Sequence, residues 1–230
     1  MHPVFVPEER LAAHLEEVEQ RWRELRASDV LSERAESVNR AVDHAAFERM
    51  FAAASGARSG GQRVVWLHRA ADVIARGVTQ AQASPCQKGC SHCCHTPVLL
   101  SRAEATYLST VSSRKMVQTP HNAVNAEKEL QRETGPANTL DGAADRWKHH
   151  TGQPCPFLKE SACSVWSARP LACRFYYSLD ADNLLCRLLP EHRPVEVPQL
   201  NVLLFTAMAW GVLGLRQDAA DIRDWFAEVA

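Results

Sequence analysis

The placement of the cysteines constrains this chain more than any other feature. All eight lie between residues 86 and 186, and the segments before and after that stretch contain none. They are Cys86, Cys90, Cys93, Cys94, Cys155, Cys163, Cys173 and Cys186. Because thiols stay reduced in the cytosol, clustered cysteines there indicate metal or redox chemistry rather than structural disulfides.

The first cysteine loop has a spacing that suits metal ligation. Turns of the form Cys-x2–4-Cys aim thiolates at one ion, and zinc takes four such ligands in a tetrahedron. The pairs Cys86/Cys90 and Cys90/Cys93 fit this spacing, and Gly89 supplies a permissive backbone position between them. Iron–sulfur clusters also use four thiolates, and Cys155-Pro156 resembles the Cys-Pro end of ferredoxin motifs, although the full ferredoxin spacing is absent.

The adjacent residues Cys93 and Cys94 are awkward ligands for a single ion, since successive side chains of an extended chain point in opposite directions. One of them can bind the metal while the other serves a second metal or stays a thiol. The surplus over four ligands leaves three alternatives open: a multinuclear centre, an iron–sulfur cluster with spare thiols, or a reactive cysteine beside the metal. Isolated cysteines would instead be expected to pack as small hydrophobic side chains.

Apolar residues recur at helical spacing through the first eighty residues. The pattern predicts one helix over 11–25, a second that runs from Val38 to Phe51, and a third over 64–81, with a glycine-rich loop at 55–61. Ser101 and Glu104 have the form of a capping box, which predicts a helix over 102–112.

The rest of the chain gives a mixed pattern. We expect a helix start at Thr119-Pro120, a short helix that holds Leu140 and Trp147, and irregular structure over 152–179. Two helices should follow, one from Val202 and one from near Asp218; the second should bury Ile222, Trp225 or Phe226, and Val229.

Strand signals are sparse, so the predicted fold is mainly α, with helices framing an irregular, cysteine-rich metal-binding loop region. We expect three segments: an N-terminal helical segment over 1–83, a cysteine-cluster metal-binding domain over 84–190, and C-terminal helices over 191–230 that pack on the same core.

Charge and hydropathy exclude several classes of partner. The formal net charge of −1 gives no electrostatic reason to expect nucleic acid or membrane binding. The longest apolar run, Val202 to Leu215, is shorter than the roughly 20 residues that span a bilayer, and the first residues lack the form of a signal peptide. We therefore expect a cytoplasmic protein whose partner is a protein or a small molecule.

Several charged or polar residues flank the cysteines. Arg169 and Arg174 are candidate cofactor-binding residues, because they would offset the negative charge of a thiolate site or bind an anionic substrate. We expect His92 and His95 to lie beside the metal rather than to ligate it. The pair His149-His150 is expected at an exposed helix end.

Two motifs in this order resemble the YkgJ-like cysteine-cluster family, which is described as a zinc- or iron-chelating domain. The motifs are Cys86-Gln-Lys-Gly-Cys90-Ser-His-Cys93-Cys94, and Pro154-Cys155-Pro156-Phe157 with Cys163-Ser-Val-Trp166 and Arg169-Pro170-Leu171-Ala172-Cys173-Arg174-Phe175. The resemblance covers roughly 84–178. It implies metal chelation by Cys86, Cys90, Cys93, Cys94, Cys155, Cys163 and Cys173. Cys186 lies outside the motif.

The resemblance leaves iron–sulfur and zinc nearly even, with a slight preference for iron–sulfur from the number of thiolates. It favours a metal-binding protein in metal handling or redox sensing. A flagellin lysine N-methylase carries a similar cluster, which implies a metal- or iron–sulfur-dependent group transferase as the first alternative. A scaffold in which zinc only joins loops is the second. An open cleft beside the thiols would favour the transferase, whereas a closed thiol site would favour the binding protein.

Overall fold

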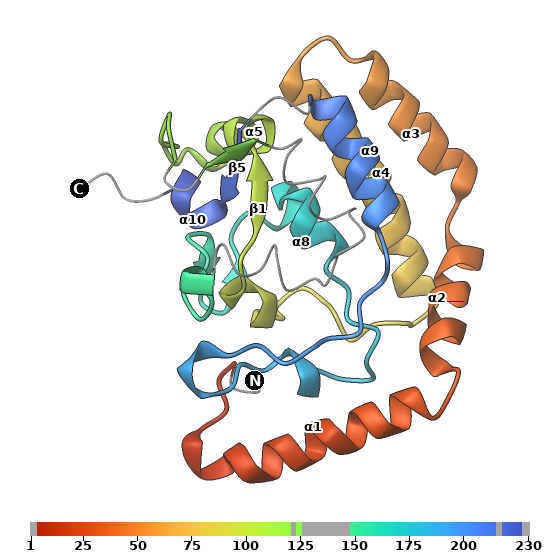
Figure 1. The fold of residues 1–230 in the computed structure, drawn as a ribbon. Coiled ribbons are helices and arrows are strands. Elements are labelled where there is room, and N and C mark those ends of the chain that lie inside the picture. Colours follow the sequence, from red (N-terminus) through yellow and green to blue (C-terminus); the bar gives the residue numbers. More distant parts are fainter. Residues whose placement is uncertain (1–3, 121–122, 126–147, 215–217, 227–230) are drawn as a thin grey trace.

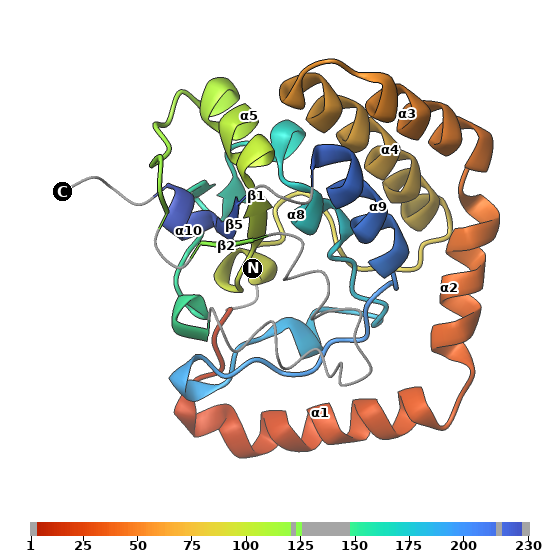
Figure 2. The ribbon, with the colours of Figure 1, turned by 45° about the horizontal axis from the view of Figure 1, so that its top comes forward.

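Helix α4 (Gly60–Gln80) is the element around which the other helices pack. The computed structural model describes residues 4–120, 123–125, 148–214 and 218–226. The helices that contact α4 are α2 (Val30–Ala41), α3 (His44–Gly56), α5 (Arg102–Ser112), α8 (Leu171–Phe175) and α9 (Leu203–Leu213). Figures 1 and 2 show α4 lying between α3 and α9. Because α4 is surrounded, its buried residues spread over more than one face.

The remaining elements are short, apart from α1. They are α1 (Leu11–Arg26), α10 (Ile222–Trp225), the strands β1 (Leu99–Ser101), β2 (Val124–Asn125), β3 (Leu158–Lys159), β4 (Ala162–Cys163) and β5 (Asp218–Asp221), and the 3-10 turns η1 (Glu8–Arg10), η2 (His92–His95), η3 (Lys148–His150), η4 (Trp166–Ala168), η5 (Leu184–Cys186) and η6 (Pro190–His192). The predicted mainly α fold with a cysteine-rich loop region is confirmed. Within the described ranges, no helix is both long and apolar enough to cross a bilayer.

Periodicity located the helices better than it located the breaks between them. The helices predicted over 11–25 and 102–112 are present as α1 and α5, and the Ser101–Glu104 capping box forms. The single helix predicted from Val38 to Phe51 is wrong, because Val42 is extended and the Asp43 carboxylate accepts a hydrogen bond from the Ala46 N–H at the start of α3. The chain there forms two helices separated by a break at Val42 and Asp43.

A small antiparallel sheet replaces two predicted helix starts. Strand β5 lies between β1 and β2, with Leu99 opposite Asp221 and Val124 opposite Ala219. The helix predicted from near Asp218 is therefore wrong at its start, since residues 218–221 pair with two distant strands before the single turn of α10. The predicted helix start at 119–120 is also wrong, because these described residues are a bend leading toward β2.

The other predictions for the second half have clear outcomes. The irregular structure predicted over 152–179 and the helix from Val202 are confirmed, as is the burial of Ile222, Trp225 and Phe226. The short helix predicted around Leu140 and Trp147 lies outside the described residues, and so does Val229.

Three hydrophobic clusters hold the cysteine loops in place. The first joins α3 and α4 to α8 and α9, and the second joins β1, α5, β5 and α10 to Phe157. The third joins α2 and α4 to Tyr177 and Leu179. Cys155 and Cys173 pack against the second cluster, and Cys86 packs against the third, so the cysteine loops lie between the clusters.

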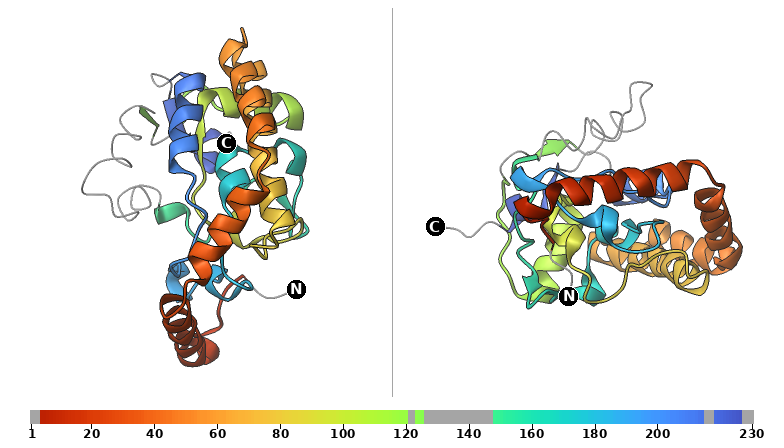
Figure 3. Two further views of the ribbon diagram at one scale, coloured as in Figure 1. Left: turned by 90° about the vertical axis from the view of Figure 1, so that its right-hand side faces the viewer. Right: turned by 90° about the horizontal axis from the view of Figure 1, so that it is seen from below.

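Helices α1 and α2 form an outer arm around this core, which Figures 1 and 3 show along the lower edge and one side of the molecule. Arg21 of α1 forms ion pairs with the fully buried Asp180 and, at 3.0 Å, with Asp182. Arg34 of α2 donates to the carbonyl of Leu179. Both arginines therefore fasten the arm to the segment that leads from α8 to Cys186.

Because α2 crosses α4 closely at Gly77, alanine should destabilise the protein at that glycine but not at Gly61. A Cβ at Gly77 would lie 2.7 Å from Val42 Cγ2 and 3.3 Å from the Val38 carbonyl oxygen, so Gly77→Ala should lower the free energy of unfolding by about 1–3 kcal/mol. Gly61→Ala on the same helix meets nothing within 4 Å and should be neutral or stabilising by up to about 1 kcal/mol. Urea unfolding of both variants measures the contrast, and equal effects would contradict this account of the crossing.

Buried His68 predicts a pH dependence of stability. Burial, with the nearby Arg174 and Arg169 charges, lowers the pKa of His68 to about 3. The unfolded chain therefore binds a proton below about pH 6.5 that the folded chain does not, so this residue makes stability fall as pH falls. Between pH 7 and pH 5 its share of the loss should be about 2 kcal/mol. Urea midpoints at both pH values for wild type and His68→Gln isolate this share, and equal pH dependence of the two proteins would contradict it.

Candidate metal centre

The first cysteine loop is shaped by its own backbone. Gly89 has φ of +94°, a conformation that favours glycine, which confirms the predicted permissive position between Cys86 and Cys90. The Cys90 N–H donates to the Gln87 carbonyl at 3.1 Å, and the Cys94 N–H donates to the Ser91 carbonyl at 3.0 Å. These two turns fold the loop that carries the first four cysteines tightly.

The second set of cysteines comes from three different small elements. Cys155 precedes the β3–β4 hairpin, Cys163 ends β4, and Cys173 lies in α8. The start of α8 is fixed by buried Glu104 of α5, whose Oε1 accepts a hydrogen bond from the Leu171 N–H at 2.9 Å. The same carboxylate closes the capping box of its own helix, so α5 positions the helix that carries Cys173.

Direct backbone hydrogen bonds join the two cysteine loops. The Cys155 N–H donates to the Cys94 carbonyl at 2.8 Å, and the Gly152 N–H donates to the His95 carbonyl at 2.7 Å. The loops that were predicted to share a metal centre therefore lie side by side.

Arg223 of α10 holds this junction, and sequence reasoning missed it. Its guanidinium donates to the carbonyls of Cys94 at 3.0 Å, Gln153 at 2.6 Å and Thr96 at 3.2 Å. It also pairs at 3.1 Å with the fully buried carboxylate of Asp221. The sequence offered one sign of this role: Asp221 and Arg223 are oppositely charged and two positions apart, in a segment that also contains the apolar Ile222 and Trp225.

Four thiols form one mutually interacting group, which we call the first group: Cys94, Cys155, Cys163 and Cys173. The pKa of the Cys173 thiol is raised by burial and then by the charges of the other three members. The pKa of Cys155 is also raised by burial and by Cys94 and Cys163, and that of Cys163 by burial and Cys94. Every pair in this group is therefore close enough to interact electrostatically.

The remaining thiols form a second group: Cys86, Cys90, Cys93 and Cys186. The pKa of Cys186 is raised by burial and by the charges of Cys86 and Cys90. Cys93 interacts with Cys90 of this group, but also with Cys94 and Cys173 of the first. Half-buried Tyr176 lies beside the second group, because its pKa is raised by burial and then by the charges of Cys186, Cys93 and Cys86. Cys186, which lies outside the recognised motif, is thus part of the thiol assembly.

Backbone N–H groups support three of the sulfurs in the same way. The N–H two positions downstream donates to the sulfur and lowers the pKa of each thiol: His92 for Cys90, Phe157 for Cys155, and Val165 for Cys163. The Ser178 N–H lies 3.5 Å from the Cys86 sulfur. Hydrogen bonds to sulfur favour the thiolate, which is the form that binds metal.

Burial opposes the thiolate at most of these positions. It raises the pKa of Cys155 and of Cys186 to about 12, and it raises the pKa of Cys90, Cys163 and Cys173 as well. At Cys94 burial has the same effect but is outweighed, because a hydrogen bond from the Cys93 thiol and the charges of Arg223 and Arg169 lower its pKa overall. A bound metal cation would replace the protons of these buried thiols. The chemistry and the burial of the thiols therefore fit a metal-binding role.

The number of sulfurs bears on the kind of centre. A single zinc ion takes four ligands, and this chain brings eight free thiols into the same region. The donor set thus suits a core of several metal ions at least as well as a single zinc ion.

The two candidate cofactor-binding arginines have different surroundings. Arg174 is buried, and its three nitrogens donate to Asp72, to the Arg169 carbonyl and to the Ser167 carbonyl. Arg169 stacks over the Trp166 ring at 4.0 Å, donates to the Tyr177 hydroxyl at 3.3 Å and lowers the pKa of Cys94. Arg169 therefore faces the first group, whereas Arg174 is used in joining α8 to α4.

The histidines near the cysteines also differ from one another. His92 is buried and its Nε2 lies 3.1 Å from the Asn183 side-chain nitrogen, while His95 Nδ1 lies 3.1 Å from the Ser91 carbonyl. The expectation that His149 and His150 are both exposed is wrong for His150, which is 7% exposed because its ring packs beside Asp224.

Comparison with known proteins agrees with this assembly of thiols. Residues 85–194 match the family model CxxCxxCC, described as "Putative zinc- or iron-chelating domain". The cysteine-rich segment belongs to this family. The matched range of the CxxCxxCC family contains all eight cysteines, including Cys186, and supports metal binding by zinc or iron. No curated protein and no solved structure matches the chain.

Because Arg223 joins the two cysteine loops, even a conservative substitution there should greatly lower the free energy of unfolding. Lysine keeps the charge but has no planar fork, so Arg223→Lys should leave loop carbonyls unpaired and lower the free energy of unfolding by about 3 kcal/mol. Arg40→Lys, at an exposed pair with Glu36, should change it by less than about 0.5 kcal/mol. Denaturant unfolding with metal analysis measures both, and full stability and metal content in Arg223→Lys would contradict the bracing role.

Proposed function

We propose that this chain holds thiolate-ligated iron–sulfur centres and acts in metal handling or redox sensing. The observation that carries the proposal is the convergence of Cys94, Cys155, Cys163 and Cys173, four thiols from separate elements in which the charge of Cys94 raises the pKa of the other three. Four cysteine thiolates are the ligand set of the common iron–sulfur clusters.

The division of the thiols supports two centres in place of one. Cys93 and Cys94 are adjacent in the chain, and Cys94 belongs to the first group. Cys93 interacts most strongly with Cys94, then with Cys173 and Cys90, and it also lies near Tyr176 beside the second group, so it stands between the two groups. This division gives each group four thiols and gives Cys186 a ligand role in the second group. Of the alternatives that the sequence leaves open, this is the one in which Cys93 and Cys94 serve different metals.

Ligand number favours iron–sulfur over zinc in this proposal. A mononuclear zinc site takes four ligands, whereas the two thiol groups together contain eight cysteines. Each common iron–sulfur cluster is held by four cysteine thiolates, so two clusters would use the whole set.

A binding or redox role is favoured over group transfer by the surroundings of the thiols. The transferase alternative needs a cleft beside the cysteines that Arg169, Arg174 or a tyrosine lines. Arg174 is fully used in structural hydrogen bonds, and Tyr176 and Tyr177 are enclosed by burial that raises their pKa. A groove of the described structure lies between α1 and η5, the turn that carries Cys186, but residues such as Gln20, Asp182 and Arg187 line it, and no cysteine, tyrosine, Arg169 or Arg174 does.

The test is metal and sulfide analysis, with an absorption spectrum, on protein purified without oxygen. Wild type should be brown and contain iron and acid-labile sulfide in about equal amounts. Cys173→Ser and Cys186→Ser should each lose about half of the iron, and the double variant should lose nearly all of it. Ser32→Ala, at an exposed position of α2, is the matched control and should keep the full content.

The other outcomes are decisive. Loss of all iron in either single variant would replace two centres by one. Stoichiometric zinc in a colourless protein would remove the iron–sulfur proposal and leave a zinc-binding protein. Protein that binds neither metal would overturn the proposed function.

A further inference from the structure

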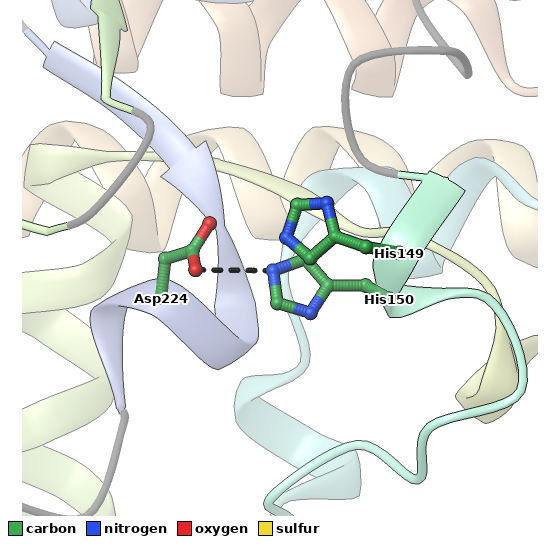
Figure 4. A group of neighbouring side chains, drawn as sticks. All are labelled: His149, His150 and Asp224. Carbon is green, nitrogen blue, oxygen red and sulfur yellow. Dashed lines mark hydrogen bonds and ion pairs between the residues drawn. The ribbon is translucent and has the colours of Figure 1, made fainter.

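A second type of metal-ligand cluster lies outside both thiol groups. His149 and His150 of η3 and Asp224 of α10 each offer one ligand atom, and these atoms lie within 4.8 Å of one another. Figure 4 shows both imidazole rings and the carboxylate facing one another across the gap between the two elements. Two imidazoles and a carboxylate form the ligand set of many sites for divalent first-row metals.

The spacing of the two buried members already matches metal coordination. His150 Nε2 lies 3.0 Å from Asp224 Oδ1. Neighbouring ligand atoms of an octahedral ion with bonds of about 2.1 Å are about 3.0 Å apart. A cation therefore requires little movement of this pair.

The second oxygen of Asp224 gives an independent indication of a ligand. The Asp224 side chain is 9% exposed, and its Oδ2 atom has no hydrogen-bond partner among the described residues. A buried carboxylate oxygen is costly to leave unpaired. A cation bound between the carboxylate and the rings would satisfy it.

His150 is held in the orientation that a ligand needs. Its Nδ1 lies 3.3 Å from Gln153 Oε1, and an N–H at Nδ1 that donates to this oxygen leaves the lone pair of Nε2 directed at Asp224. Hydrogen bonds of this kind fix the tautomer of metal-binding histidines. Arg223, the neighbouring cation in the chain, has its guanidinium directed at Asp221 and the loop carbonyls.

His149 is the member of this cluster that lies at the protein surface. Its ring is exposed and packs tilted against that of His150, with centroids 4.0 Å apart and an interplanar angle of 45°. An exposed ring can rotate about its side-chain torsions, which brings its nitrogen to bonding distance when an ion arrives. The site thus has two preset ligands and one that closes from the surface.

We propose that His149, His150 and Asp224 bind a divalent first-row transition-metal ion at a nitrogen–oxygen site distinct from the cysteine centres. Three protein ligands leave coordination positions for water or for a small anion. The proposal does not depend on what fills the thiol groups. In the contrary case, His150 and Asp224 form a simple buried pair and His149 only covers it.

Manganese(II) is the probe that separates this site from the thiols, because it prefers nitrogen and oxygen ligands over thiolate. Whole protein, purified without oxygen and with its cysteine centres intact, is titrated with Mn2+, and unbound Mn2+ is followed by its electron paramagnetic resonance signal. Wild type should remove one equivalent. His149→Gln and Asp224→Asn should each weaken binding at least about tenfold.

Two controls separate loss of the metal site from misfolding and from a general effect of removing a histidine. His44→Gln replaces an exposed histidine at the start of α3 and should bind Mn2+ as wild type does. His149 is exposed, so His149→Gln should fold normally by circular dichroism even if Asp224→Asn does not. No Mn2+ bound by wild type, or equal binding by wild type and His149→Gln, would overturn the proposal. Metal content of the thiol groups, measured on the same variants, should remain unchanged.

Discussion

The hydrogen bonds of Arg223 are the constraint on which the cysteine region depends. Loops without regular secondary structure leave backbone carbonyls that must find donors when they are buried. Arg223 supplies donors to the carbonyls of Cys94 and Gln153 from one planar group, and buried Asp221 balances its charge. Asp221 in turn ends β5 and also accepts from the Val98 N–H at 2.6 Å. The small sheet therefore orients the residue that joins the two cysteine loops.

Local signals in the sequence were enough to predict much of the fold and the chemistry of the site. Apolar periodicity predicted α1, the Ser101–Glu104 capping box predicted α5, and the apolar run from Val202 predicted α9. The clustering of cysteines indicated metal binding before any geometry was known. The break at Asp43 and the strand at Asp218–Asp221 were missed for different reasons. Asp43 ends an uninterrupted apolar pattern by capping the next helix, whereas residues 218–221 become a strand only because β1 and β2 reach them from far away in the chain.

Long-range contacts also explain which site residues sequence reasoning could not assign. Nothing in the spacing of Cys186 relates it to Cys86, because the chain between them passes through α5, the hairpin and α8 before returning. The charge balance is equally nonlocal. Arg169 and Arg223 come from different elements, yet both lower the pKa of Cys94, while burial by the apolar clusters raises the pKa of most other thiols. The low acidity of these thiols is thus a product of the same packing that stabilises the fold.

The carboxylate of Glu104 has a mechanical consequence. Its side chain accepts hydrogen bonds at the beginnings of both α5 and α8, from Ser101 and from the Leu171 N–H. Because Glu104 is buried, neither helix can exchange this bond for one to water without opening the core. The N-terminal ends of α5 and α8 are therefore tied together. A displacement of the start of α5 would shift the start of α8 as well, and with it the helix that carries Cys173.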